Sequence, residues 1–247
     1  MARGFRAPSL KELYLNFVDI NHDIHGNENL KAETSINTNV FLQYNSKLGS
    51  AYTWGLELNI FNNNIKDNIK LLPVLGDNPN TNPYSYINVH SFISQGVEFS
   101  FNNKIYPWLT IKFGYALTGE KVELSETITS DFEYYSDFNA SVNYWFRKAD
   151  LNFSLYYKYN GVSPMLYIVD GDNVEYGYMN SYNTLDINVS RWFWKRRVNV
   201  QVGGKNLFNN TDIDISEGNN TGVHGGGPES VNWGRTFFIR LQFKFNK

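Results

Sequence analysis

The sequence predicts an all-β protein, an antiparallel up-and-down transmembrane β-barrel of about ten strands. Three observations predict it. Apolar and polar residues alternate in about ten segments spread over the 247 residues, which is the period of a strand with two different faces. The connections between these segments are alternately short and long. The tryptophans gather near the short connections.

The alternating segments follow one another in the same two-faced pattern. In "LTIKFGYALT", for example, Leu109, Ile111 and Phe113 alternate with Thr110 and Lys112. The first segment is the end of a strand near residues 2–8, and the next eight are 36–44, 54–60, 96–102, 109–118, 138–146, 151–160, 185–190 and 198–204.

The last segment, "TFFIRLQFKF", shows the pattern most clearly. Its predicted lipid-facing residues are Phe237, Ile239, Leu241, Phe243 and Phe245. The opposite faces of the segments carry the charges Glu57, Glu98, Lys112, Lys158, Asp186, Arg240 and Lys244. A small closed barrel with a packed interior would bury these charges at high cost, whereas a wide lumen tolerates them. A soluble sandwich would also alternate, with its charged faces outside.

The connections give the barrel two different ends. Short connections lie near 46–50, 103–107, 147–149 and 194–197, and long ones near 9–32, 73–83, 119–133, 168–178 and 209–233. Short periplasmic turns and long extracellular loops are typical of outer-membrane barrels. Near the short turns lie Trp54, Trp108, Trp145, Trp192 and Trp194. This placement predicts an interfacial aromatic girdle and argues against the soluble sandwich.

Composition excludes several other classes. A net charge of −2 argues against a nucleic-acid partner. The absence of cysteine excludes disulfides and thiol chemistry. No run of apolar residues reaches the ~18 that a transmembrane helix needs. The start, "MARGFRAPSL", lacks the apolar region of a signal peptide, so we expect the chain to be a piece of a longer exported protein.

Two boxes near the start carry a family resemblance. "RGFRAPSLKELY" contains Arg3, Gly4, Phe5, Arg6, Ala7 and Pro8, and "GNENLKAE" contains Gly26, Asn27 and Leu30. They resemble the paired FRAP and NPNL boxes of TonB-dependent outer-membrane receptors, with Glu28 in place of a proline. "GVEFSF", "GKNLFNN" and "WGRTFFIRLQFKF" resemble the C-terminal barrel of the same family, although Asn246 and Lys247 follow the last aromatic residue.

The resemblance implies a 22-stranded barrel, plugged by an N-terminal domain, in the outer membrane of a Gram-negative bacterium. Such a receptor imports a scarce ligand, of the ferric siderophore, haem or cobalamin class, with energy relayed by TonB. Residues 1–247 would then be the C-terminal portion of the barrel, without plug domain or signal peptide. The implied partners are membrane lipid, the plug and rest of the barrel, and the TonB complex. No catalytic residues and no resident cofactor are expected, haem or a ferric chelate being cargo.

Three histidines are candidate ligand-binding residues. His22 and His25 lie between the two boxes, and haem receptors of this family carry an axial haem ligand in that interval. The pair is alternatively a transition-metal site, since neutral imidazole suits iron and other metals. His224 lies in a glycine-rich loop. Solvated loop histidines are the simpler interpretation of all three.

Two other outer-membrane proteins remain as alternatives. A complete ten-stranded enzyme such as an omptin-like protease needs acidic residues and an Asp–His couple at its rim. Asp19, His22 and Asp23 supply the residue types, but no second acidic pair is apparent. A passive porin would lack the two boxes.

Overall fold

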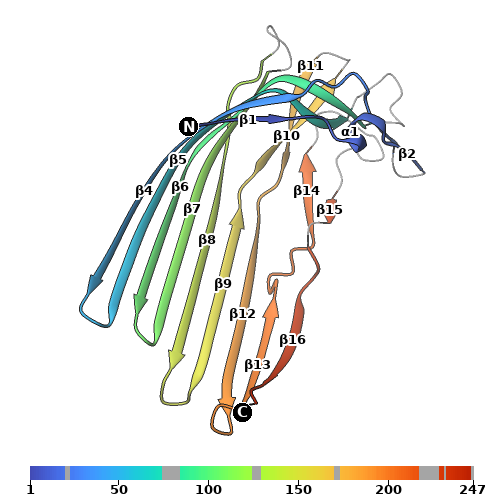
Figure 1. The fold of residues 1–247 in the computed structure, drawn as a ribbon. Helices are drawn as coiled ribbons and strands as arrows, with labels where there is room; N and C mark the ends of the chain where they lie inside the picture. The colour runs from blue at the N-terminus through green and yellow to red at the C-terminus, as the bar shows by residue number, and fades with distance from the viewer. Residues whose placement is uncertain are drawn as a thin grey trace.

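The fold is one long, curved β-sheet with a second small sheet at one end. The computed structural model describes residues 1–19, 23–73, 84–123, 129–169, 173–216, 228–230 and 232–245. Ten antiparallel strands form the main path of the sheet, in the order β1-β4-β5-β6-β7-β8-β9-β12-β13-β16 (Figure 1). These are the ten strands that the alternation predicts.

The strands of the path are β1 (Ala2–Arg6), β4 (Glu33–Leu48), β5 (Tyr52–Pro73), β6 (Tyr84–Ile105), β7 (Leu109–Glu123), β8 (Glu133–Phe146), β9 (Leu151–Asn160), β12 (Tyr182–Phe193), β13 (Val198–Lys205) and β16 (Thr236–Phe243). Between β1 and β4 lie α1 (Leu10–Tyr14), β2 (Asn16–Val18) and β3 (Asp23–His25), and β3 pairs in parallel with β6. No helix among the described residues is long and apolar enough to cross a membrane.

The long loops carry a small sheet that the sequence does not predict. It consists of β10 (Ser163–Val169), β11 (Asn173–Met179), β14 (Asp212–Ser216) and β15 (Pro228–Ser230). The backbone N–H of Asn180 donates to the carbonyl of Asp214 at 3.0 Å, so two loops far apart in sequence are joined. Figure 1 shows this sheet at the end of the wall opposite the short turns.

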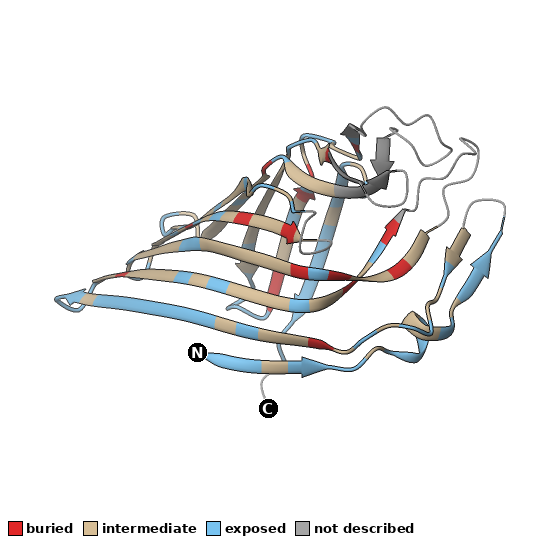
Figure 2. Ribbon diagram, turned by 90° about the horizontal axis from the view of Figure 1, so that it is seen from above, coloured by how far each residue is buried: buried red, intermediate tan, exposed pale blue. Residues whose placement is uncertain are grey.

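The main sheet is open. Its path begins with β1, which pairs with β4, and ends with β16, which pairs with β13. Viewed from above, the strands form a curved wall (Figure 2). A complete ten-stranded barrel would need its first and last strands to pair, so the structure confirms the predicted barrel wall and disfavours a small closed barrel.

The register gives the wall two chemically different faces. One row joins Leu42, Leu58, Phe99, Tyr115 and Phe138 across five neighbouring strands. We call the face that holds this row the apolar face. The next row along joins residues that include Gln43, Glu57 and Ser100. We call the face that holds it the polar face.

The strands β5 and β6 are longer than the alternation predicts. The expected segments were 54–60 and 96–102, whereas each strand has 22 residues and ~9–11 suffice to cross a membrane. The pairing continues past the apolar band because backbone hydrogen bonds do not require an apolar side chain. Beyond the band, Leu72, Val89 and Val122 form a small buried cluster.

The tryptophans confirm one prediction and correct another. All five predicted indoles lie on or beside the short turns. Trp145 and Trp192, however, pair with Asn152 and Asn199 and therefore lie in rows of the polar face. The alternation of apolar and polar residues already assigns both tryptophans to the polar face. The indole N–H of Trp145 donates to Asp150 at 2.9 Å. The outer girdle consists instead of Trp54 and Trp108 with their ring neighbours Tyr44, Tyr144 and Phe146.

The assignment of faces predicts opposite outcomes for two adjacent substitutions. The five predicted lipid-facing residues of the last segment are 56–91% exposed. Leu241 pairs with Val200 on the apolar face, and Gln242 pairs with Asn199 on the polar face. In the full-length receptor folded into lipid vesicles, Leu241→Arg should lower the free energy of unfolding by roughly 2–4 kcal/mol, whereas Gln242→Arg should be nearly silent. Equal damage from both substitutions would contradict the assignment.

Candidate functional site

Of the three predicted histidines, only His25 lies among the described residues. His22 and His224 lie outside them. His25 ends β3, and its Nε2 lies 2.6 Å from a carboxylate oxygen of Asp23. No group of three metal-ligating side chains occurs in the described part of the chain, so the structure leaves haem or metal binding by the histidines as a prediction.

The first box forms an ion-pair network at the long-loop end of the wall. The Arg6 guanidinium donates to both oxygens of Glu33, at 2.6 and 2.8 Å, and to Glu12 at 2.9 Å. Glu12 also completes the capping box of α1 with Ser9. Glu33 is buried and receives further hydrogen bonds from the Asn68 amide and the Ile69 backbone N–H. The network therefore ties β1, α1, β4 and β5 together.

These contacts fix the charge of Glu33. The hydrogen bonds from Arg6 hold the pKa of this carboxyl below its ordinary value of 4.5, against the opposing effect of burial, and the Ile69 N–H and Arg6 charge add to the lowering. Glu33 lies three residues before Ile36, where the apolar alternation of β4 begins, so the group is beyond the band. A carboxylate with this many donors is stable as an anion although it is buried.

The second box packs against the first. Asn27 donates from its backbone N–H to the Glu12 carbonyl and from its side chain to the Tyr86 carbonyl, at 2.9 and 3.0 Å. A Cβ on Gly26 would lie 2.7 Å from the backbone of Leu13, so this close approach requires glycine. The other predicted motif residues are Arg3, Gly4 and Phe5 on β1, Ala7 and Pro8 before α1, and Leu30 after β3.

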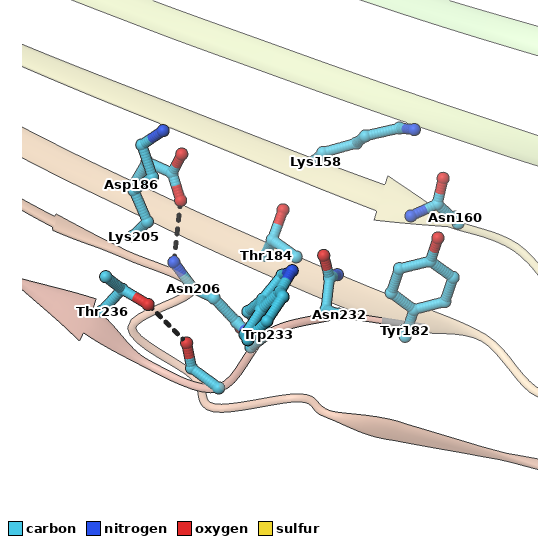
Figure 3. A pocket seen from close by; sticks show the side chains of 11 residues that line it. Lys158, Asn160, Tyr182, Thr184, Asp186, Lys205, Asn206, Asn232, Trp233 and Thr236 are labelled. Atoms are coloured by element: carbon cyan, nitrogen blue, oxygen red, sulfur yellow. Dashed lines mark hydrogen bonds between the residues drawn. The ribbon is translucent and has the colours of Figure 1, made fainter. Parts of the chain in front are cut away.

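A pocket lies on the polar face, near the long-loop end. It has a volume of about 580 Å³ and is lined by residues of β9, β12, β13 and the segment before β16. Lys158 and Lys205 contribute positive charge, Asp186 contributes negative charge, and Tyr182 and Trp233 contribute rings (Figure 3). Trp233 is 89% exposed, so its ring is accessible to a ligand.

Asn206 organises the floor of this pocket. Its backbone N–H donates to Asp186 at 2.8 Å, and its side chain donates to the carbonyls of Asn210 and Trp233 at 2.9 and 3.0 Å. Its φ of +48° is left-handed, a conformation that asparagine tolerates better than most residues. The "GKNLFNN" segment thus holds β12 and the segment before β16 together.

Sequence reasoning missed this pocket. The sequence predicts Lys158 and Asp186 only as charges of the polar face and does not single out Lys205. Alternation gives a residue's face but not its neighbours on strands that are distant in sequence. Asn160, another lining residue, has a buried side-chain nitrogen without a hydrogen-bond partner among the described residues. The pocket therefore offers cations and rings to a ligand.

An open, two-faced antiparallel wall with short turns at one end and long loops at the other defines a portion of an outer-membrane-type β-barrel. The sequence profile of the family "TonB dependent receptor-like, beta-barrel" matches residues 2–207. The chain belongs to this family, whose members are outer-membrane transport receptors of Gram-negative bacteria. No curated protein matches the sequence.

Solved structures show the same fold. The ferric enterobactin receptor PfeA of Pseudomonas aeruginosa aligns with a TM-score of 0.60 at 21% identity, over 98% of this chain and 37% of its own. The siderophore receptor PirA of Acinetobacter baumannii gives 0.58 and 19%, over 98% and 38%. The FrpB iron transporter of Neisseria meningitidis gives 0.56 and 18%, over 90% and 33%. The chain thus spans about a third of the length of these proteins.

The ion-pair network predicts a pH-dependent stability. Arg6→Ala should lower the free energy of unfolding by about 2–3 kcal/mol at neutral pH, because it leaves the buried Glu33 without its main partner. The pKa of Glu33 is lower in the folded protein than its ordinary value of 4.5, so the ion pair stabilises the folded state fully above about pH 4.5. This stabilisation is lost as the pH falls through the pKa of the folded state. The difference between wild type and variant should therefore shrink below about pH 4.5.

Arg3→Ala is the matched control, since Arg3 lies on the same strand with its side chain on the opposite face. Denaturant titration of the full-length receptor in detergent between pH 3 and 7 measures both variants. A pH-independent cost for Arg6→Ala, or an equal cost for Arg3→Ala, would contradict the role given to the network.

Proposed function

We propose that residues 1–247 form the C-terminal wall of a larger TonB-dependent receptor. The family match over residues 2–207 carries this proposal. The open sheet supports it, because in lipid the unpaired backbone groups of β1 and β16 need partner strands. The rest of the barrel would supply these strands, and an N-terminal part would supply the plug and the contact with the TonB complex.

We propose a ferric siderophore as the cargo. The names of the solved relatives, a ferric enterobactin receptor and a siderophore receptor among them, favour this class. The pocket supports it on chemical grounds, since Lys158 and Lys205 suit an anionic chelate and Tyr182 and Trp233 suit its rings. Iron is then cargo, and the wall itself needs no resident cofactor, catalytic residue or nucleic-acid partner.

Removing the two pocket lysines should weaken binding of the chelate. Lys158→Ala/Lys205→Ala should raise its dissociation constant by about a hundredfold or more, because each of the two charge-assisted contacts contributes roughly 1.5–3 kcal/mol. Lys112→Ala is the control, since Lys112 lies on the same face but lines another pocket, with Trp54. Tryptophan-fluorescence titration with ferric enterobactin as the probe measures both. An equal effect of the two variants, or none, would contradict the proposed cargo site.

Haem is the second candidate cargo, and one contact favours it. Asp23 holds Nε2 of His25, which leaves Nδ1 as the nitrogen for iron, as in sites where a carboxylate orients a ligating histidine. Haemin titration followed in the Soret region compares the full-length receptor with its His22→Ala/His25→Ala variant. Haem transport predicts weaker binding and a changed spectrum in the variant. Identical titrations would remove haem as the cargo and leave the siderophore.

A further inference from the structure

A further pocket lies between the wall and the small sheet, beyond the apolar band. It has a volume of about 340 Å³ and is lined by residues of β5 and β7 and by Pro164 of β10. A cavity of this size accommodates a small organic molecule. It shares no lining residue with the pocket around Asn206. We call it the loop-sheet pocket.

Lys70 reaches this pocket because the pattern of β5 changes at Asp67. Counted in steps of two from Leu58 and Ile60, Lys70 would lie on the apolar face. Asp67 has a left-handed φ of +53° and no partner in the register of β5 with β6. Beyond it, the Lys70 ammonium lies 3.9 Å from the centre of the Phe92 ring, and Phe92 belongs to a row of the polar face. The alternation therefore breaks here, and the lysine lies on the polar side of the wall.

The loop-sheet pocket presents two opposite charges that do not pair with each other. Lys70 and Glu120 both line it, yet neither forms an ion pair with a described residue. Each is held by a neutral group instead. The Phe92 ring lies under the ammonium, and the Tyr135 hydroxyl donates to the Glu120 carboxylate at 2.9 Å. Two half-buried charges are thus fixed at the pocket without an ionic partner.

The environment of Lys70 favours an anionic group beside it. Burial holds the pKa of the Lys70 ammonium below its ordinary value of 10.5, and the charge of Glu120 opposes this effect. The lowered pKa means that the charged form lacks part of the stabilisation that water would give it. A ligand carboxylate beside the ammonium would supply that stabilisation.

The rest of the lining adds an acceptor and an apolar surface. The Asn68 side chain donates an N–H to Glu33 at 2.9 Å, which leaves its carbonyl oxygen as an acceptor. Three apolar lining residues are at most 8% exposed, namely Ile69, Leu72 and Val122. Pro164 adds apolar surface from the small sheet. The pocket therefore combines a cation, an anion, an acceptor and an apolar wall.

We propose that the loop-sheet pocket binds a small zwitterion, an α-amino acid with an apolar side chain. The carboxylate of the ligand pairs with Lys70. Its ammonium lies between Glu120 and the carbonyl oxygen of Asn68, and its side chain lies on Leu72 and Val122. The site is separate from the proposed cargo pocket, so the inference does not depend on the nature of the cargo.

The two charges favour a zwitterion over other occupants. A plain anion would pair with Lys70 but be repelled by Glu120, and a plain cation would meet the reverse. A neutral apolar molecule would remove water from both charges and give them no partner. Because both charges line one pocket of about 340 Å³, the two charges of the ligand must lie close together, as they do in an α-amino acid.

Isothermal titration calorimetry of the full-length receptor in detergent tests the inference, with L-leucine as the probe. Isocaproate lacks the ammonium of leucine, and isoamylamine lacks its carboxylate. Lys70→Met and Glu120→Gln each remove one charge and retain the length of the side chain. Lys66→Met is the matched control, since Lys66 lies on the same strand, is exposed and does not line the pocket. Retained heat-modifiable migration in gel electrophoresis confirms the fold of each variant.

Wild type should bind L-leucine, and both isocaproate and isoamylamine at least about tenfold more weakly, because each loses one charge-assisted contact. Lys70→Met and Glu120→Gln should each weaken leucine binding by about tenfold or more, whereas Lys66→Met should match wild type. No binding of leucine, or equal affinity for the three molecules, would overturn the zwitterion assignment without any variant. Unchanged binding in both pocket variants, or an equal loss in Lys66→Met, would overturn the site itself. The assay uses no iron chelate, so its outcome is independent of the proposed cargo.

Discussion

The structure depends on one constraint, the pairing of every backbone N–H and C=O in a setting where water cannot do so. The pair of β5 and β6 meets it over the greatest length, since one register, interrupted at Asp67, runs from Tyr52 opposite Ile105 to Pro73 opposite Tyr84. Once that ladder is fixed, side chains must alternate between two faces, and the sequence places apolar residues on one of them. Among the described residues, the two edge strands β1 and β16 lack a partner on their outer side, and this is the physical reason for our proposal that the wall belongs to a larger barrel.

Much of this follows from the sequence because the two-residue period acts locally. The ten strands, their faces and the two unlike ends of the wall are readable from alternation and from the lengths of the connections. Where the structure differs, contacts distant in sequence are responsible. The small loop sheet forms between segments such as β11 and β14, and no local sequence pattern predicts that these two strands pair. The bidentate contact of Arg6 with Glu33 joins residues 27 positions apart. The two boxes can therefore be found in the sequence, whereas the hydrogen bonds between them cannot. The same holds for the pocket around Asn206, which strands distant in sequence assemble.

The two ends of the wall have different tasks. At the short-turn end, rings such as Trp54 and Trp108 border the apolar face, and the turns themselves are tight. At the long-loop end, polar residues dominate. The network around Glu33 stabilises the border of the wall, and the pocket around Asn206 lies on the polar face near it. The residues that we propose for cargo binding thus lie at the long-loop end, and the remainder of the wall is a regular scaffold.

The central claim is that one face of this wall meets lipid and the other an aqueous lumen. The chain contains no cysteine, so spin labels can be attached at single positions introduced along β7, from Leu109 to Gly119, in the full-length receptor in lipid bilayers. Relaxation by oxygen and by a water-soluble nickel complex then reports the surroundings of each label. The account predicts opposite oscillations of period two, with oxygen contact highest at Leu109, Ile111, Phe113, Tyr115 and Leu117, and a loss of that contrast by Gly119. Equal access of the nickel complex to both sets of positions, or an oscillation of the opposite phase, would contradict it.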